Sequence, residues 1–162
     1  MTTQTMPTTY REGRGRLLGR MLATEGDWGA TVARVALGGV MLPHGAQKLL
    51  GWFGGFGFHA TMGFLTTQVG LPYPIAVLVI LIESFGGLFL VLGLGGRVMA
   101  AGVAAVMVGA VVTTHLANGF FMNWAGTQRG EGFEYHILAF ALALVVMLRG
   151  SGAMSVDRAL WD

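Results

Sequence analysis

The hydrophobic residues of the chain gather into four long stretches separated by short polar or aromatic segments. The stretches cover residues 28–50, 74–94, 97–117 and 135–149. A helix needs about 20 apolar residues to cross a hydrocarbon core of roughly 30 Å, and each stretch approaches that length. A short Gly-rich turn joins the second stretch to the third, which predicts a tight antiparallel hairpin. The pattern predicts an all-α polytopic membrane protein with four transmembrane helices in an up-and-down bundle. Residues 28–149 would form this domain, and residues 1–27 and 150–162 would be its tails.

Two longer connections on one side of the predicted bundle are aromatic. Residues 51–72 are apolar and interrupted by glycines, which is typical of a short interfacial helix or a re-entrant segment. Its candidate membrane anchors are Trp52, Phe53, Phe56 and Phe58. Residues 118–133 mix aromatic with charged side chains. Both connections fit an aromatic belt with a solvated turn, and the alternative is that together they cover a pocket.

The composition indicates that the bilayer is the solvent of this chain. Of its 162 residues, 54% are hydrophobic and 11% are charged, whereas a soluble domain carries about 25% charged residues. The 27 glycines suit membrane helices, in which small residues let backbones approach closely. The absence of cysteine excludes disulfides, thiol redox chemistry and cysteine-ligated iron–sulfur clusters. The net charge of +2 reflects basic residues beside the spans and indicates no nucleic-acid partner.

The basic residues predict the orientation of the bundle. They lie before the first span, in the second connection and after the fourth span, at Arg11, Arg14, Arg16, Arg20, Arg97, Arg149 and Arg158. In a four-span chain all three places are on one side of the membrane, which the positive-inside rule makes cytoplasmic. We therefore expect a multi-pass protein of a bacterial-type cytoplasmic membrane with both termini inside and no cleaved signal peptide.

Polar and ionisable residues inside the predicted spans cluster at similar depths. At a rise of about 1.5 Å per residue, the first span places His44 and Lys48 in the outer part of the membrane, one turn apart. His115 and His136 reach the same height in the third and fourth spans, and Glu83 lies nearer the midplane. Polar groups from several helices are less costly when they satisfy one another than when each meets lipid. We therefore expect His44, Lys48, Glu83 and His115 to line one pocket that opens to the outer side.

Each of these residues also has a purely structural interpretation. Lys48 is able to extend to the headgroups, and His44 and His115 are able to bond backbone carbonyls within the bundle. Glu83 is harder to explain in this way, because an acid near the midplane costs about 3 kcal/mol on insertion scales. Arg34, nearer the inner face, is expected to extend inward or to pair with Glu83.

Proline and small residues indicate how the helices bend and pack. Pro43 removes a hydrogen bond inside the first helix and is expected to kink it, turning His44 toward Glu83. Small residues of the second and third spans are expected to line helix–helix contacts, namely Gly86, Gly87, Gly102, Ala105 and Gly109.

Four motifs in order resemble the DoxX family of small four-helix membrane proteins. They are H-G-x-x-K in RVALGGVMLPHGAQKLLGW, E-x-x-G-G and G-x-x-x-R in LIESFGGLFLVLGLGGRVMA, and G-x-G followed by S-x-D in GSGAMSVDRAL. A third span that ends in THLANGFF adds to the likeness, which covers roughly residues 30 to 160. By position, the resemblance implicates His44, Gly45, Lys48, Glu83, Gly86, Gly87, Arg97, His115 and Asp157.

The resemblance also implies a function near the quinone pool. Members resemble subunits linked to terminal quinol oxidase and thiosulfate:quinone oxidoreductase, and others look like membrane partners of soluble redox enzymes. A bound quinone would need hydrogen-bond donors such as His44 or His115 and a proton-exchanging acid such as Glu83. Haem held by two of the histidines is a lesser alternative. The competing hypothesis is a non-catalytic anchor or assembly partner for a larger complex, and a small-molecule or lipid binder is a third.

Overall fold

Every regular element that the computed structural model describes, in Thr24 and residues 26–161, is helical. The long segments are α2 (Trp28–Leu50), the continuous run of α4 (Tyr73–Leu81), η2 (Ile82–Gly86) and α5 (Gly87–Leu92), the run of α6 (Gly96–Ala110), η3 (Val111–His115) and η4 (Leu116–Asn118), and α7 (Glu134–Arg149). The shorter elements are α3 (Gly57–Gly63), η1 (Phe64–Gln68) and α8 (Val156–Trp161). The long segments begin and end within two residues of the predicted apolar stretches. Most of the predicted tail of residues 1–27, with its four arginines, lies outside the described residues.

Two of the long segments are apolar and long enough to cross a membrane. They are Tyr73–Leu92 and Gly96–Asn118, with mean hydropathies of 2.6 and 1.8 in their most apolar windows. Polar residues interrupt α2, and α7 has 16 residues. Within the described part of the chain, length and apolarity therefore identify two candidate spans.

Local signals explain where the helices begin and end. The Asp27 side chain caps α2 by accepting hydrogen bonds from the backbone N–H groups of Gly29, at 2.7 Å, and Ala30, at 3.4 Å. Gly51 ends α2 with a positive φ of 74°. The turn between α5 and α6 contains Gly93 and Gly95, both with positive φ, so the predicted short Gly-rich turn is present. Pro43 lies inside α2, which continues past it to Leu50.

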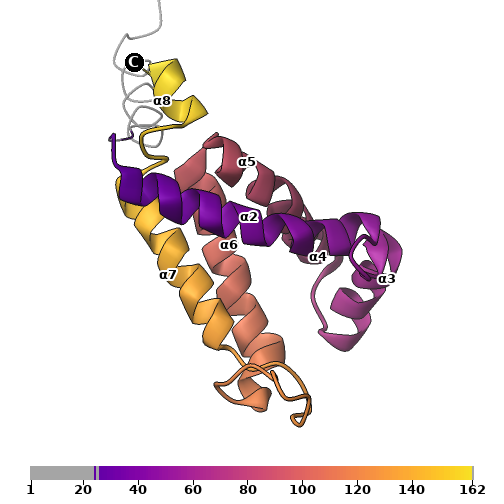
Figure 1. The fold of residues 1–162 in the computed structure, drawn as a ribbon. Coiled ribbons are helices and arrows are strands. Elements are labelled where there is room, and N and C mark those ends of the chain that lie inside the picture. The colour runs from indigo at the N-terminus through magenta and orange to yellow at the C-terminus, as the bar shows by residue number, and fades with distance from the viewer. Residues whose placement is uncertain (1–23, 25, 162) are drawn as a thin grey trace, which may run out of the picture.

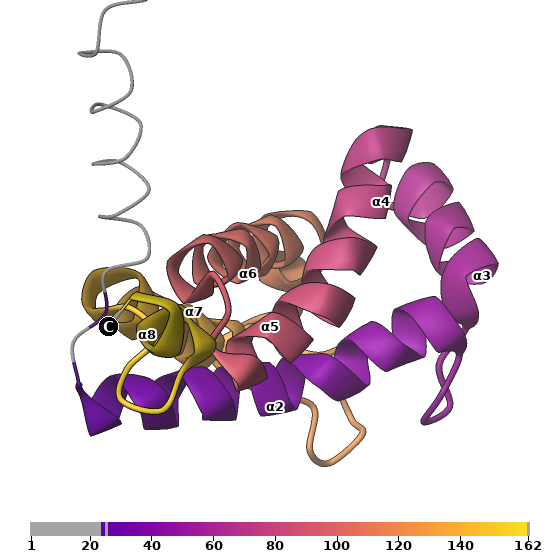
Figure 2. The same ribbon diagram turned by 90° about the horizontal axis from the view of Figure 1, so that it is seen from above.

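The helices form two arms that meet near the described chain ends and diverge from there (Figures 1 and 2). One arm, the α2–α5 arm, contains α2, α3, η1, α4, η2 and α5, and α2 packs along η2 and α5. The other arm, the α6–α7 arm, contains α6, η3, η4 and α7, and α2 packs against α7 where the arms meet. Buried side chains from both arms form the main core there, including Leu37, Met41, Leu90, Val103 and Val146. We call this junction the termini end.

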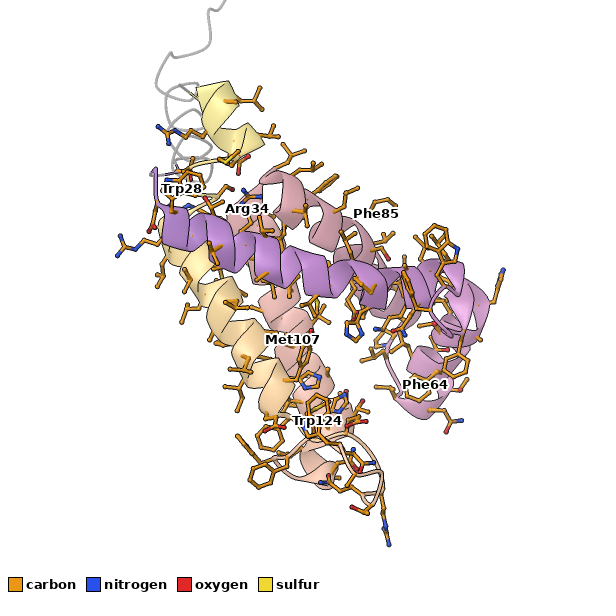
Figure 3. The ribbon with its side chains drawn as sticks, in the orientation of Figure 1. Trp28, Arg34, Phe64, Phe85, Met107 and Trp124 are labelled. Atoms are coloured by element: carbon orange, nitrogen blue, oxygen red, sulfur yellow. The ribbon has the colours of Figure 1, made fainter. Side chains whose placement is uncertain are left out.

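A buried arginine ties the termini end together (Figure 3). Arg34 is 1% exposed. Its Nη1 donates to the carbonyl oxygens of Leu90 and Val91 at 2.6 and 2.5 Å, and Nε donates to that of Ser151 at 2.7 Å. Its Nη2 donates to the carbonyl oxygen of Met154. The expected pair of Arg34 with Glu83 is therefore wrong, because the segment after α7 folds back over this helix end and binds the guanidinium through its carbonyl oxygens.

Small residues allow close helix contacts at several of the expected positions. A Cβ added at Gly87 would lie 3.0 Å from the backbone nitrogen of Leu42, and one at Gly102 would lie 3.3 Å from the Ile82 side chain. Gly86 also faces neighbouring side chains. The expectation is wrong for Gly109, where an added Cβ would meet nothing within 4 Å, and for the exposed Ala105. Both line a cavity.

The first aromatic connection forms one continuous helical stretch, α3 followed by η1, which packs against α4 at the far end of its arm. A second apolar cluster joins Met62 and Leu65 of this stretch to Ala76 and Ile80 of α4, and Phe58 packs against it. The other candidate anchors stay exposed, at 60% for Trp52, 69% for Phe53 and 84% for Phe56. Phe64 and Leu65 of this stretch line the cavity between the arms.

Candidate functional site

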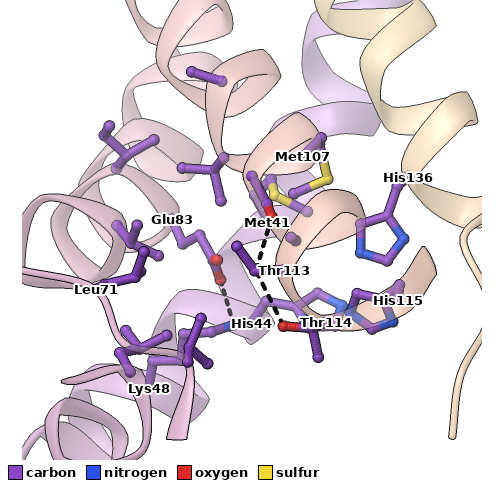
Figure 4. Close-up of a pocket in the computed structure, with 18 of the residues that line it drawn as sticks. Met41, His44, Lys48, Leu71, Glu83, Met107, Thr113, Thr114, His115 and His136 are labelled. Carbon is purple, nitrogen blue, oxygen red and sulfur yellow. Dashed lines mark hydrogen bonds and ion pairs between the residues drawn. The ribbon is translucent and has the colours of Figure 1, made fainter. Parts of the chain in front are cut away.

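A cavity of about 460 Å³ lies between the two arms. This volume is typical of small-molecule sites, which span about 300–1,000 Å³. Its walls are mainly apolar, with Phe64 of η1 on one arm and Met107 of α6 on the other (Figure 3). Its polar lining residues come from both arms and include His44, Lys48, Glu83, His115 and His136 (Figure 4). The four side chains expected to share one pocket therefore line the same cavity.

An ion pair joins α2 to η2 at the wall of the cavity. The Lys48 Nζ and a Glu83 carboxylate oxygen are 2.5 Å apart. The Glu83 side chain is 7% exposed and that of Lys48 is 29% exposed. Lys48 therefore points to Glu83 and not to a headgroup. The ion pair also offsets the free-energy cost of burying the Glu83 carboxylate, because a carboxylate removed from water needs a partner.

Backbone contact between α2 and η2 brings the two charges together. Gly45 lies so close to η2 that an added Cβ would collide with the backbone of Glu83 and Ser84. The Ser84 hydroxyl donates to the Gly45 carbonyl oxygen at 3.1 Å. Glu83 and His115 each lie in a π-helical turn, η2 and η3. Such turns are rare and are frequent at functional sites.

Gly45→Ala is expected to destabilise the protein by about 1–3 kcal/mol, because the new methyl group forces apart two backbones in contact. Gly39→Ala is the matched control, since Gly39 lies on the same helix and an added Cβ there would meet nothing within 4 Å. This control should be neutral or slightly stabilising, because alanine has the higher helix propensity. Thermal unfolding in detergent checks both variants. Equal melting temperatures for the two variants would contradict the close contact.

A row of rings continues the polar lining across the cavity. The ring centroids of His44 and Tyr135 are 6.0 Å apart, those of Tyr135 and His136 are 5.7 Å apart, and those of His136 and His115 are 4.2 Å apart. His115 Nδ1 lies 2.8 Å from the Glu131 carbonyl oxygen. His115 thus both lines the cavity and contacts a backbone carbonyl, so its two interpretations hold together.

Two buried polar atoms in this row have no hydrogen-bond partner within the described structure. They are the Tyr135 hydroxyl oxygen and the His136 Nδ1. Burying an unpaired hydroxyl or imidazole nitrogen costs free energy. Such atoms in a native structure are usually bonded to a ligand or a water molecule. Tyr135 was not predicted as a site residue, and His136 was expected only at the height of the polar cluster and among the alternative haem ligands. Their positions at the start of α7, directly after the second aromatic connection, were the available signal in the sequence.

Other residues singled out by the sequence motifs lie at the termini end. Asp157 is 3% exposed, and its carboxylate accepts from the backbone N–H groups of Gly95 and Gly96 at 2.8 and 3.0 Å. The Ser151 hydroxyl also donates to it, at 2.6 Å. Arg97 donates to the carbonyl oxygens of Met147 and Leu148 at the end of α7. Asp157 and Arg97 therefore fasten helix ends and are remote from the cavity. Across the described residues, no three His, Cys, Asp or Glu side chains are placed to hold a metal ion.

Comparison with known proteins supports the resemblance drawn from the sequence motifs. The family model described as DoxX matches residues 29–116, which cover the first connection, the first candidate span and nearly all of α2 and of the second candidate span. The chain is 28% identical over 129 residues to a Bacillus subtilis (strain 168) protein named "Putative oxidoreductase CatD", covering 80% of this chain and 84% of that protein. No solved structure matches the chain at a significant level.

Proposed function

Because the chain belongs to the DoxX family, we propose that it is the membrane subunit of a quinone-linked oxidoreductase and that the cavity binds the quinone head group. The observation that carries the proposal is the pair of buried, unpartnered polar atoms on Tyr135 and His136, two residues that line a mainly apolar cavity together with the Lys48–Glu83 pair. An apolar pocket with a few convergent polar groups is the usual form of a small-molecule site.

The chemistry of the donor set fits a quinone. The Tyr135 hydroxyl is a donor suited to a carbonyl oxygen, and His136 offers a ring nitrogen that either donates or accepts. Lys48 and Glu83 place an ammonium group and a carboxylate beside the cavity, and side chains of these kinds act as general acids and bases. Apolar side chains such as Met41, Val79 and Met107 exclude water from a flat ring. A bound quinone would supply the redox chemistry by taking up electrons together with protons at its carbonyl oxygens.

Electrons would come from a protein partner. The chain has no cysteine, so cysteine-ligated iron–sulfur clusters and thiol chemistry have no ligands here. The oxidoreductase wording in the name of the Bacillus subtilis relative agrees with such a redox role. The chain would thus supply the quinone site, and a soluble or membrane partner would supply the electron carrier.

The proposal places four spans in a bacterial cytoplasmic membrane with both termini inside. Arg97, Arg149 and Arg158 all belong to elements of the termini end, which the positive-inside rule assigns to the cytoplasm. The exposed aromatic side chains of Trp52, Phe56 and others lie on the connections at the opposite end, where they suit the outer interface. The cavity then faces the outer half of the membrane.

Binding of the tail-less ubiquinone head group by the purified protein tests the proposal. Tyr135→Phe is expected to raise the Kd about tenfold, since a hydrogen bond to a buried partner contributes roughly 1.4 kcal/mol. Its stability should not fall, because the lost hydroxyl has no partner in the folded chain. Tyr73→Phe is the matched control, since Tyr73 is exposed and does not line the cavity. Absence of quinone binding to the unaltered chain would contradict the proposal and favour the non-catalytic anchor.

A further inference from the structure

The cavity is open on the side between α4 and α6. Ile75 and Leu78 of α4 line it and are 46% and 50% exposed. Ala105 and Gly109 of α6 also line it and are exposed. The two walls are held together at η2 and α5, where α6 packs, and α4 diverges from α6 beyond that contact (Figures 1 and 2). Because lining residues are exposed on both of these facing helices, the cavity has a lateral opening between α4 and α6, which we call its mouth.

The smallest residue of this mouth stands where a side chain would narrow it. A Cβ added at Gly109 would meet nothing within 4 Å. Gly109 is helical, so another residue fits its backbone without strain. Glycine costs about 1 kcal/mol relative to alanine inside a helix. Glycine at position 109 therefore lowers helix stability without allowing a close packing contact in return. The need for an open passage accounts for a glycine there.

The mouth lies at hydrocarbon depth. It is framed by the two candidate spans, Tyr73–Leu92 and Gly96–Asn118. At the rise of an α-helix, Leu78 lies about 8 Å inside the end of its span and Gly109 roughly 14 Å inside the end of its own. A headgroup-level or aqueous entrance would be nearer those ends, where Met122 and Glu131 of the second connection line the cavity. An opening between apolar helices at this depth faces acyl chains.

We propose that a lipid-soluble ligand enters the cavity sideways from the bilayer and leaves its apolar tail between α4 and α6, with Gly109 keeping the passage open. The inference rests on the proposed function and specifies its ligand as a quinone with a hydrocarbon tail. The polar head is held at Tyr135, His136 and the Lys48–Glu83 pair, and the tail extends past Leu78 and Gly109. A tail-less quinone uses the same head site without the passage.

The opening itself is testable because the chain has no native cysteine. A bimane fluorophore on Gly109→Cys, in nanodiscs that contain doxyl-labelled phospholipid, is expected to be quenched, and decylubiquinone should relieve the quenching. Val108→Cys is the control on lipid-facing α6, since Val108 is 51% exposed and does not line the cavity. Its quenching should persist with the quinone. An unquenched label at position 109 would overturn the lateral opening, and quenching that decylubiquinone leaves unchanged would show an acyl chain as the occupant.

Gly109→Leu tests the role of the passage in binding. Its Kd for decylubiquinone is expected to rise about tenfold or more, while that for the tail-less head group changes by less than about twofold. Gly39→Leu is the matched control, because Gly39 is also helical, exposed and without a contact within 4 Å, and lies outside the cavity. It should leave both Kd values unchanged. Equal losses for the two quinones, or none, would overturn the inference.

The two proposals fail in different ways. If neither quinone binds the unaltered chain, the proposed function is wrong and the ligand of the cavity is not a quinone. The doxyl quenching at position 109 then still shows whether the passage opens to lipid. If the tail-less head group binds and Gly109→Leu does not raise the Kd for decylubiquinone, the proposed head-group site is supported and the lateral passage is wrong.

Discussion

Arg34→Met is expected to destabilise the protein by about 3 kcal/mol or more, the largest single effect on folding that we anticipate. The guanidinium is the common donor for carbonyl oxygens of Leu90, Val91, Ser151 and Met154. Methionine keeps much of the volume and provides no donor. The Leu90 oxygen still accepts from the Gly93 N–H, and each other buried carbonyl that loses its only donor costs about 1–3 kcal/mol.

The effect should extend beyond α2, because Arg34 joins three parts of the chain. It binds the end of α5 and the segment that leads to α8, and Asp157 of α8 caps the start of α6. Releasing residues 150–161 therefore also removes the cap of α6. We expect faster proteolysis after Arg149 and Arg158 in the variant, alongside the lower melting temperature.

Two further variants make this expectation specific. Arg34→Lys should recover only part of the stability, because one ammonium group cannot reproduce the planar fork of a guanidinium. Arg129→Met, in the exposed second connection, should leave the melting temperature unchanged. A melting temperature for Arg34→Met within experimental error of the unaltered chain would show that the buried hydrogen bonds are not what fastens the termini end.

The helical segments were predictable because the residues near each helix end determine where that helix begins and ends. Long apolar runs end at glycines, as at Gly51 and Gly93, which adopt positive φ. Asp27 begins α2 as a cap. These signals act within a few residues, so one sequence suffices to find them, and the all-helical prediction is confirmed for the described residues.

The faces of the helices were less predictable. A segment such as Tyr73–Leu92 is apolar nearly all round, so hydropathy does not say which side meets another helix. Gly109 was assigned to a contact for its size alone and lies at the cavity mouth. The π-helical turns around Glu83 and His115 shift the register of the side chains that follow. The local amino-acid composition does not predict where such turns occur.

Long-range contacts account for the remaining errors at polar residues. Arg34 was expected to extend inward or to pair with Glu83, and neither expectation anticipates a C-terminal segment that folds back onto the same helix end. Depth did serve for His44, Lys48, Glu83 and His115, which line one cavity. Tyr135 and His136 were left out of the expected pocket because their significance is the lack of a partner, a property of the folded chain alone.

The second large effect is expected at the ion pair. Lys48→Met should destabilise the protein by about 3–5 kcal/mol, because it leaves the carboxylate of Glu83 buried without its cation. Glu83→Gln should cost less, since Lys48 is 29% exposed and its ammonium is able to turn toward water. The double variant Lys48→Met/Glu83→Gln should recover most of the stability lost in Lys48→Met, because no unpaired charge remains.

Quinone binding separates this structural role from the proposed function. All three variants should bind the tail-less ubiquinone head group at least about tenfold more weakly than the unaltered chain. In the double variant the weak binding should accompany a nearly normal melting temperature, so misfolding does not explain the loss. The pair would then serve the ligand as well as the fold. A double variant that keeps both its stability and its Kd would instead assign Lys48 and Glu83 to joining α2 with η2, and would leave ligand binding to Tyr135 and His136.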